Sequence, residues 1–274
     1  MTICIGAISK NDDKTKESAV VVSDRMVTVG LPPIEFEQKL SKSIQITQNC
    51  VVSIAGSALA FSDILNDVRS NLSEGQNYSI SQIAETIRNS YTRIRNKKIE
   101  EVILSGIGMS SIREFFERNM TLSQSIVNNV FDAFSRYNYG LVILVTGTDI
   151  NGAHVLRIDN PGTILSYDSI GYCAIGIGEI HAMSTFIAND YYPYLDLNHV
   201  VALSYEAKKR SEKAQGVGQQ SDLFIIKDGK STKLTDEQIT NLNNIYDARA
   251  DQEKKAVSNI EESIKNLKID DFFN

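Results

Sequence analysis

Short apolar runs rich in β-branched residues dominate the first part of the chain. The runs Thr2–Ile8 and Ala19–Val22 flank the polar stretch Ser9–Glu17, which predicts two strands joined by a long loop. A second pair of strands is predicted at Lys42–Ile46 and Val51–Ala55, where polar and apolar residues alternate in the first member. The chain therefore begins with four strands arranged as hairpins.

After the fourth strand the apolar residues recur at intervals of three and four, the spacing of an amphipathic helix. One helix is predicted at Ala58–Arg69. A second begins just after Ser79, because Ser79 and Gln82 have the spacing of a capping box. A third covers Leu122–Phe134. The second and third helices belong to a helical insertion at about residues 70–136.

Strand and helix patterns then alternate up to a final strand. The predicted strands are Leu141–Thr148, His154–Ile158, Thr163–Ser166 and Leu223–Lys227, and the predicted helices are Ile180–Asn189 and Asn198–Lys213. Hairpins with helices grouped between them indicate an α+β fold, in which two antiparallel sheets pack face to face and helices cover their outer faces. No internal repeat is evident, and we expect one domain over residues 1–230.

Residues 231–274 form a charged tail with a different pattern. Thr235 and Gln238 have the spacing of a second capping box, and apolar residues recur at helical intervals among many charges. We expect one or two amphipathic helices that dock on the body or on a neighbouring subunit. The apolar end Phe272–Asn274 fits either a docking peg or a frayed terminus.

Composition and charge narrow the class of protein. The 274 residues are 42% hydrophobic and 23% charged, as in ordinary globular proteins, and the net charge of −6 argues against nucleic-acid binding. No apolar run is long enough to span a membrane and no signal-peptide pattern is present, so we expect a cytoplasmic protein without a membrane partner. Cys4, Cys50 and Cys173 are isolated and the three histidines are scattered, so we expect no metal or other cofactor.

Thr2 is a candidate nucleophile at the start of the first strand. Methionine before a small residue is normally removed, which would leave Thr2 with a free α-amine beside its hydroxyl. Such a residue can act alone, because the hydroxyl attacks a carbonyl carbon and the amine takes its proton. The reference pKa of an α-amine, about 7.7–8.0, suits this role near neutral pH. The competing interpretation is an ordinary strand residue.

Further segments in a fixed order strengthen this hypothesis. They are Ser23-Asp24-Arg25 after the second strand, Lys42–Ile46, Ala55-Gly56-Ser57-Ala58 before a helix, and the glycine-rich turn Tyr172–Gly178. With Thr2 and the interval of fourteen residues from Lys42 to Gly56, this order resembles proteasome β-type subunits. It is most similar to the single-chain proteasome-related proteins of archaea and bacteria among the N-terminal-nucleophile hydrolases. The resemblance covers roughly residues 2–229 and implies a four-layer αββα sandwich.

The resemblance implies four catalytic residues. Thr2 would be the nucleophile, with its own amine as the base. Lys42 would lie beside it, where its positive charge lowers the pKa of the amine. Lys39 competes for this role, and Lys42 is preferred for its spacing to Gly56. Asp24 would pair with Lys42 and keep it oriented. The backbone N–H of Gly56 would bind the oxyanion of the tetrahedral intermediate.

Four residues would support this site. Arg25 either joins the same charge cluster or is exposed, Ser57 follows the oxyanion glycine, and Gly178 closes the glycine-rich turn. Glu179 stands where the family usually has a serine, and its carboxylate would raise the pKa of the amine or orient it. The stretch 214–220 lacks the aspartate and serine that the family places before its last strand.

The predicted function is hydrolysis of amide bonds in a peptide or protein substrate through an ester on Thr2. The family resemblance also implies a homo-oligomer. Three alternatives stay open at this point. An amine acceptor in place of water would make the chain a peptide ligase. A loss of chemistry would make it a silent proteasome-like assembly subunit. The insertion at residues 70–136 is a candidate binding module.

Overall fold

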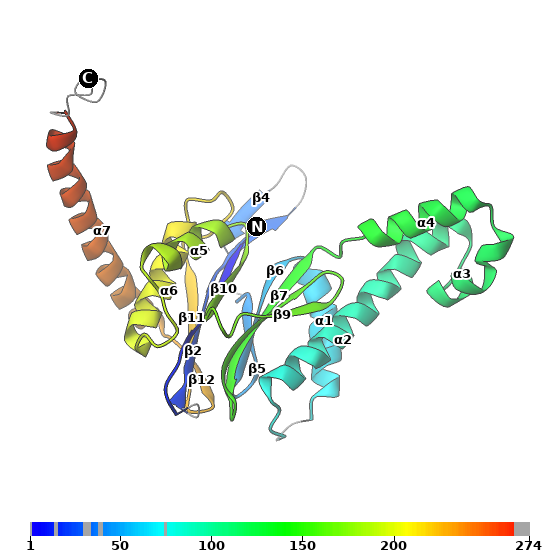
Figure 1. The fold of residues 1–274 in the computed structure, drawn as a ribbon, viewed down its shortest axis with the longest axis horizontal. Coiled ribbons are helices and arrows are strands. Elements are labelled where there is room, and N and C mark those ends of the chain that lie inside the picture. The colour runs from blue at the N-terminus through cyan, green and yellow to red at the C-terminus, as the bar shows by residue number, and fades with distance from the viewer. Residues whose placement is uncertain (1, 14–15, 30–33, 38–40, 74–75, 266–274) are drawn as a thin grey trace, which may run out of the picture. The chain divides into compact units, whose positions relative to one another are not determined.

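The computed structural model divides the chain into two compact units, Met1–Lys233 and Leu234–Asn274 (Figure 1). The sequence analysis placed this division after residue 230. Lys39 and Phe272–Asn274 lie outside the residues that the structure describes. The described residues are 2–13, 16–29, 34–37, 41–73 and 76–265.

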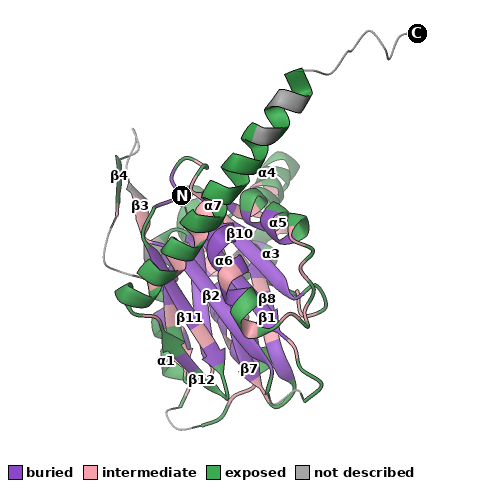
Figure 2. Ribbon diagram, turned by 90° about the vertical axis from the view of Figure 1, so that its left-hand side faces the viewer, coloured by how far each residue is buried: buried purple, intermediate pink, exposed green. Residues whose placement is uncertain are grey.

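The first sheet of the larger unit has five antiparallel strands in the order β10-β1-β2-β11-β12. Their bounds are Tyr172–Gly176, Ile3–Ser9, Ser18–Asp24, Ser221–Lys227 and Lys230–Lys233. Every residue of β1 and β2 is buried, which is the pattern of strands covered on both faces (Figure 2). The predicted strands in this part of the chain are therefore central ones.

The second sheet also has five antiparallel strands, in the order β5-β6-β7-β8-β9. Their bounds are Ser43–Thr47, Cys50–Gly56, Leu141–Asp149, Gly152–Asp159 and Thr163–Ser166. One buried cluster joins the two sheets, since Cys4 and Val21 of the first pack with Leu144 and Val155 of the second. The sheets therefore pack face to face around a shared apolar core.

Helices pack against the outer face of each sheet. Helices α5 (Glu179–Ala188) and α6 (Leu197–Ser211) contact the first sheet, chiefly β1, β2 and β10. Helix α2 (Ile80–Ile99) contacts β7, β8 and β9 of the second sheet, and helix α1 (Ala58–Asn71) packs beside α2 in the same apolar cluster. The expected α+β class with antiparallel sheets is thus confirmed.

The predicted helical insertion extends from α2. A π-helical turn (Glu100–Leu104) and a short 3-10 turn (Ser105–Ile107) continue α2, and α3 (Ile112–Arg118) and α4 (Gln124–Arg136) follow. A small separate core holds these elements together, with the buried ring of Phe115 at its centre. The predicted capping box of α2 is present, because Ser79 and Gln82 exchange side-chain and backbone hydrogen bonds.

Four strands were not predicted. β3 (Met26–Val29) and β4 (Ile34–Glu37) form a separate two-stranded ribbon, and residues of β4 such as Ile34 and Phe36 are exposed. The third, β12, is a polar edge strand. Residues of β4 and β12 are mostly exposed, so the apolar alternation that finds core strands does not detect them. The fourth is β10, whose sequence was interpreted only as part of the glycine-rich turn Tyr172–Gly178, although four of its five residues are buried.

Over its described residues, 234–265, the second unit contains a single helix, α7 (Asp236–Lys265). Thr235 and Gln238 form the predicted capping box at its start: each backbone N–H donates to the other residue's side-chain oxygen. The tail is therefore one long helix over its described length.

Candidate active site

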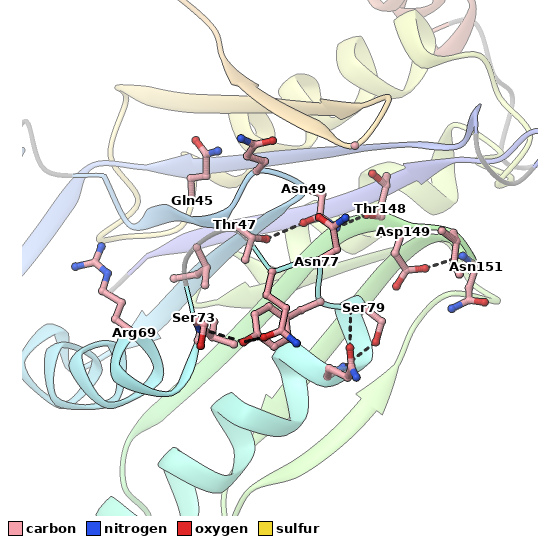
Figure 3. Close-up of a pocket in the computed structure, with 18 residues that line it drawn as sticks. Gln45, Thr47, Asn49, Arg69, Ser73, Asn77, Ser79, Thr148, Asp149 and Asn151 are labelled. Carbon is pink, nitrogen blue, oxygen red and sulfur yellow. Dashed lines mark hydrogen bonds between the residues drawn. The ribbon is translucent and has the colours of Figure 1, made fainter.

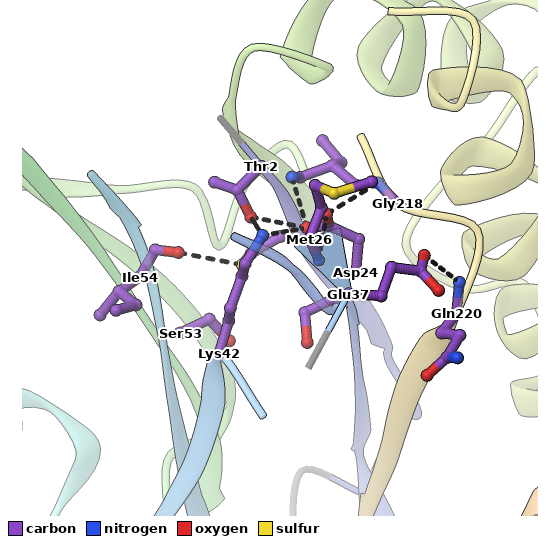
Figure 4. A network of polar contacts seen from close by, with 12 residues as sticks. Thr2, Asp24, Met26, Glu37, Lys42, Ser53, Ile54, Gly218 and Gln220 are labelled. Atoms are coloured by element: carbon purple, nitrogen blue, oxygen red, sulfur yellow. Dashed lines mark hydrogen bonds and ion pairs between the residues drawn. The ribbon is translucent and has the colours of Figure 1, made fainter. Parts of the chain in front are cut away.

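Three predicted site residues meet at one end of the two sheets (Figure 4). Thr2 precedes β1 and Asp24 ends β2, and the antiparallel register that sets Cys4 opposite Ser23 brings them together. Lys42 reaches the same point from the second sheet, where it precedes β5. The site therefore forms only when the two sheets are packed together.

The side chains of Thr2, Asp24 and Lys42 form a closed triangle of hydrogen bonds. Lys42 Nζ donates to Thr2 Oγ1 at 2.5 Å and to Asp24 Oδ1 at 2.7 Å, and Thr2 Oγ1 donates to Asp24 Oδ1 at 2.6 Å. The Asp24 side chain is fully buried and that of Lys42 is 11% exposed. Burying such a pair is costly unless both charges are well bonded, as they are here. The triangle holds the hydroxyl against a cation before any substrate binds.

Backbone groups complete the environment of the Asp24 carboxylate. Oδ1 accepts from the N–H of Ile3 at 3.0 Å, and Oδ2 accepts from the N–H groups of Met26 at 3.1 Å and Gly218 at 2.9 Å. A buried carboxylate that accepts several backbone hydrogen bonds is fixed in orientation. Asp24 therefore has the partners needed to hold both Lys42 and the Thr2 hydroxyl in place.

The glycine-rich turn lies directly against Thr2. Gly178 N–H donates to the carbonyl oxygen of Thr2 at 3.4 Å, and the Gly178 carbonyl accepts from Ser211 Oγ at 3.1 Å. Gly176 has a φ of +105°, and a Cβ there would lie 2.3 Å from the Thr2 carbonyl oxygen. Only glycine allows this approach. Of the two glycines of the motif, only Gly178 was predicted to support the site.

Gly56 and Ser57 lie where β6 leads into α1. The N–H of Ile54 in β6 donates to the carbonyl oxygen of Lys42 at 3.2 Å. Gly56 is two residues beyond Ile54 in the same strand. Gly56 is exposed and has a φ of +119°, and a Cβ there would lie 2.0 Å from the Gly140 carbonyl oxygen. Ser57 is the N-cap of α1, so its side chain has a structural role.

Glu179 lies differently from the expectation that its carboxylate acts on the Thr2 amine. Its Oε1 accepts from Arg157 Nη1 at 2.7 Å, and Arg157 also pairs with Asp159. Burial acts to lower the pKa of Arg157, but the bonds to these two carboxylates outweigh it and raise that pKa. The carboxylate of Glu179 is therefore paired with an arginine of β8, a partner that the sequence pattern did not indicate.

Arg25 belongs to a second charge cluster, next to the triangle. Its guanidinium donates to Asp222 Oδ1 at 3.1 Å from Nε and 2.6 Å from Nη2, and Lys233 Nζ lies 2.7 Å from the same oxygen. Burial alone would raise the pKa of Asp222, but the hydrogen bonds from these two cations lower it. The structure thus places Arg25 in this second cluster with Asp222 and Lys233, and its side chain is only partly exposed.

The stretch 214–220 supports the site through its backbone. Gly218 N–H bonds to Asp24, as described, and Gln220 N–H donates to Glu37 Oε1 of the β4 ribbon at 2.9 Å. A Cβ at Gly218 would lie 2.6 Å from Glu37 Oε1, so glycine suits this close approach. This stretch contains no aspartate or serine, and the main-chain N–H of Gly218 is its donor to Asp24.

Cys4 lies beneath the triangle but is not a rival nucleophile. Its thiol is fully buried and donates to the Ile54 carbonyl at 3.2 Å. Burial raises the pKa of Cys4 to about 12, which keeps it protonated at neutral pH. Cys4 therefore does not compete with the hydroxyl of Thr2 as a nucleophile at neutral pH.

A cavity of 1060 Å³ lies at the end of the second sheet opposite to Lys42 (Figure 3). It is lined by the turn that joins β5 to β6, the turn that joins β7 to β8, and the start of α2. Its lining is largely amides and hydroxyls, among them Gln45, Asn49 and Asn77. None of the three triangle residues lines it, so it is separate from the candidate active site.

The sequence matches no protein-family model and no curated protein. Among the described residues, no group of three His, Cys, Asp or Glu side chains is arranged to hold a metal ion. Within the same part of the chain, no helix is both long and apolar enough to cross a membrane.

Proposed function

We propose that the protein is an N-terminal threonine hydrolase of amide bonds in peptides or proteins. The observation that carries the proposal is the position of Thr2 Oγ1 between Lys42 Nζ and Asp24 Oδ1. The sequence resemblance to single-chain proteasome-related proteins supports it. So does the packing of two sheets between helical layers, since the expected αββα sandwich of N-terminal-nucleophile hydrolases has that order of layers.

The proposed reaction needs the removal of Met1, which frees the α-amine of Thr2. In the first step the amine takes the proton of Oγ1 while Oγ1 attacks the substrate carbonyl carbon. Lys42 donates to Oγ1 and stabilises the negative charge that develops as the proton leaves. Gly56 N–H would donate to the oxyanion formed on the carbonyl oxygen, and one such donor contributes about 2.7–4 kcal/mol.

Collapse of this intermediate breaks the carbon–nitrogen bond. The departing amine takes the proton held by the Thr2 ammonium, and the acyl group stays on Oγ1 as an ester. Water then attacks the ester while the Thr2 amine takes its proton. The bond between the carbonyl carbon and Oγ1 breaks, the acid leaves, and the Thr2 ammonium returns the proton to Oγ1. Each step uses groups of Thr2 itself, held in place by Asp24 and Lys42.

The second candidate is a silent assembly subunit. The pairing of Glu179 with Arg157 favours it, because the family's supporting serine is then replaced by a side chain engaged elsewhere. The two candidates differ in one measurable property, which is turnover that depends on Thr2.

The test is turnover of a peptide library by the untagged protein and by Thr2→Ala. Alanine is also small, so Met1 is removed from both proteins and only the hydroxyl differs. The proposal predicts cleavage by the unchanged protein and a loss of about 1000-fold or more in Thr2→Ala. Equal turnover by both proteins, or none by either, would favour the silent subunit or a contaminating peptidase.

A further inference from the structure

A lysine is buried in helix α6 behind the candidate active site. The side chain of Lys208 is 0% exposed and lies on the helix face that also carries Val200, Ser204 and Ser211. Burial lowers the pKa of this ammonium, and the charge of Glu212 counteracts the effect. A buried cation is strongly destabilising unless it is paired and hydrogen-bonded, so its partners indicate its role.

Lys208 has two close partners. Nζ donates to Glu212 Oε1 at 2.6 Å and to the backbone carbonyl of Gln219 at 2.6 Å. Glu212 follows α6 directly, whereas Gln219 belongs to the stretch 214–220 that leads into β11. Because the Lys208 ammonium is charged, its bond to the Gln219 carbonyl is stronger than a hydrogen bond between neutral groups.

The carbonyl held by Lys208 belongs to the residue immediately after Gly218. Gly218 N–H donates to Asp24 Oδ2 at 2.9 Å, and Gln220 N–H donates to Glu37 Oε1 at 2.9 Å. Three consecutive residues are thus fixed from α6, from β2 and from β4. The Gln219 carbonyl and the Gln220 N–H belong to one planar peptide unit, which Lys208 and Glu37 hold from its two sides. The segment that follows Gly218 directly is therefore fixed in place.

We propose that Lys208 is a positioning residue for the reaction: its bond to the Gln219 carbonyl holds the Gly218 N–H against the carboxylate of Asp24. This inference rests on the proposed threonine chemistry. Lys208 acts through the loop and then through Asp24, which orients Lys42 and the Thr2 hydroxyl. It does not act on the substrate, so its loss lowers kcat and leaves KM nearly unchanged.

The test compares Lys208→Met with Lys209→Met. Lys209 is the next residue and donates to the other oxygen of the same Glu212 carboxylate at 2.9 Å, so both variants remove one charge and one bond to Glu212. The expected result is a fall in kcat of about 100-fold for Lys208→Met. Lys209→Met stays within about threefold of the unchanged protein. Equal effects of the two variants, or an unchanged kcat in Lys208→Met, would overturn the proposal.

A second variant covers the case in which Lys208→Met does not fold. Gly218→Ala places a Cβ 2.6 Å from Glu37 Oε1 and 3.0 Å from Met26 Cβ, which displaces the loop while Lys208 stays in place. The proposal predicts a similar fall in kcat in Gly218→Ala alone. If Lys208→Met folds, combining it with Gly218→Ala should cause little further loss, because both act on one contact. A Gly218→Ala protein with the original kcat, or additive losses in the double variant, would contradict it.

Amide hydrogen exchange at Gly218 gives a readout that does not depend on activity. The expected result is faster exchange at Gly218 in Lys208→Met than in Lys209→Met, with the strands of both proteins equally protected. Equal protection of Gly218 would overturn the positioning role. If the unchanged protein shows no turnover that depends on Thr2, the proposed function fails, and the exchange measurement still decides the role of Lys208 in the loop.

Discussion

The hydroxyl oxygen of Thr2 lies 2.5 Å from the ammonium nitrogen of Lys42, which is forty positions later in the sequence. The two residues come from different sheets, and Asp24 binds both of them. Preorganised charge of this kind is most effective when it is in place before the reaction starts. The contact between Thr2 and Lys42 is therefore the basis of the functional account.

Replacing Lys42 tests whether this cation, and not Lys39, supports the chemistry of Thr2. Lys42→Met keeps most of the side-chain volume and removes the charge, so we expect acylation of Thr2 by a β-lactone to slow by about 1000-fold. It also leaves the buried Asp24 unpaired, which should lower the free energy of unfolding by about 3–5 kcal/mol. Intact-mass kinetics and urea unfolding measure the two effects.

Lys39→Met is the matched control, since Lys39 was the competing lysine in the sequence. It should leave both the acylation rate and the unfolding free energy close to those of the unchanged protein. A greater loss in Lys39→Met than in Lys42→Met would mean that the wrong lysine has been assigned.

Gly176→Ala should disturb Thr2 directly. The new Cβ would lie 2.3 Å from the Thr2 carbonyl oxygen at a φ of +105°, so the start of β1 must shift. Gly229→Ala is the control, because it also has a positive φ, +70°, but nothing lies within 4 Å of its Cβ. Gly229→Ala should lower the free energy of unfolding by about 1–2 kcal/mol and leave the acylation rate of Thr2 unchanged. Similar acylation rates in the two variants would argue against close packing at Thr2.

The thiol of Cys4 should resist alkylation in the folded protein. It is fully buried and its pKa is raised to about 12 by burial, so almost no thiolate forms at pH 8. We expect iodoacetamide to leave Cys4 unmodified until urea unfolds the chain, as followed by peptide mass spectrometry. Rapid modification of Cys4 in the folded protein would show that the site is open to a thiol mechanism.

His154 pairs with two carboxylates, and one of them, Asp149, lines the polar cavity of Figure 3. This pairing predicts that the free energy of unfolding depends on pH. The ring nitrogens of His154 lie 2.7 Å from Asp168 Oδ2 and 3.2 Å from Asp149 Oδ1, and Asp149 also accepts from the N–H of Ile80 at the start of α2. Burial acts to lower the pKa of His154, but the two carboxylates outweigh it and the pKa is raised. Protonated His154 therefore stabilises the folded state.

This contribution is complete below the ordinary histidine pKa of about 6.5 and is lost as the pH rises through the raised value in the folded protein. The free energy of unfolding of the unchanged protein should exceed that of His154→Gln more at pH 6 than at pH 9. Asp168→Asn should reduce this difference. A gap between the unchanged protein and His154→Gln that is the same at both pH values would contradict the assignment.

The sequence predicted the parts of the fold that a buried face controls. The central strands and α1, α2, α5 and α6 follow from apolar periodicity, because each must place a continuous apolar surface against the core. The two-stranded ribbon of β3 and β4, in which most residues of β4 are exposed, carries no such signal. The end of α6 carries a signal that the prediction did not use. The helical period puts Lys208 on the buried face of the helix, where a lysine side chain needs charged or polar partners.

The site was predicted unevenly for a similar reason. Asp24 and Lys42 followed from motif order and spacing, and the structure brings both to Thr2. The partner of Glu179 could not be found in this way, because Arg157 comes from the opposite sheet and no local pattern connects them. The Gly218 donor was also missed, since a backbone N–H leaves no trace in side-chain chemistry.

The most direct test is the intact mass and peptide map of the untagged protein after treatment with a threonine-directed epoxyketone, beside Thr2→Ala. The account predicts a chain without Met1 that gains one adduct, located at Thr2 and absent from Thr2→Ala. A chain that keeps Met1, or an adduct of equal yield in both proteins, would contradict the claim that Thr2 is an amino-terminal nucleophile.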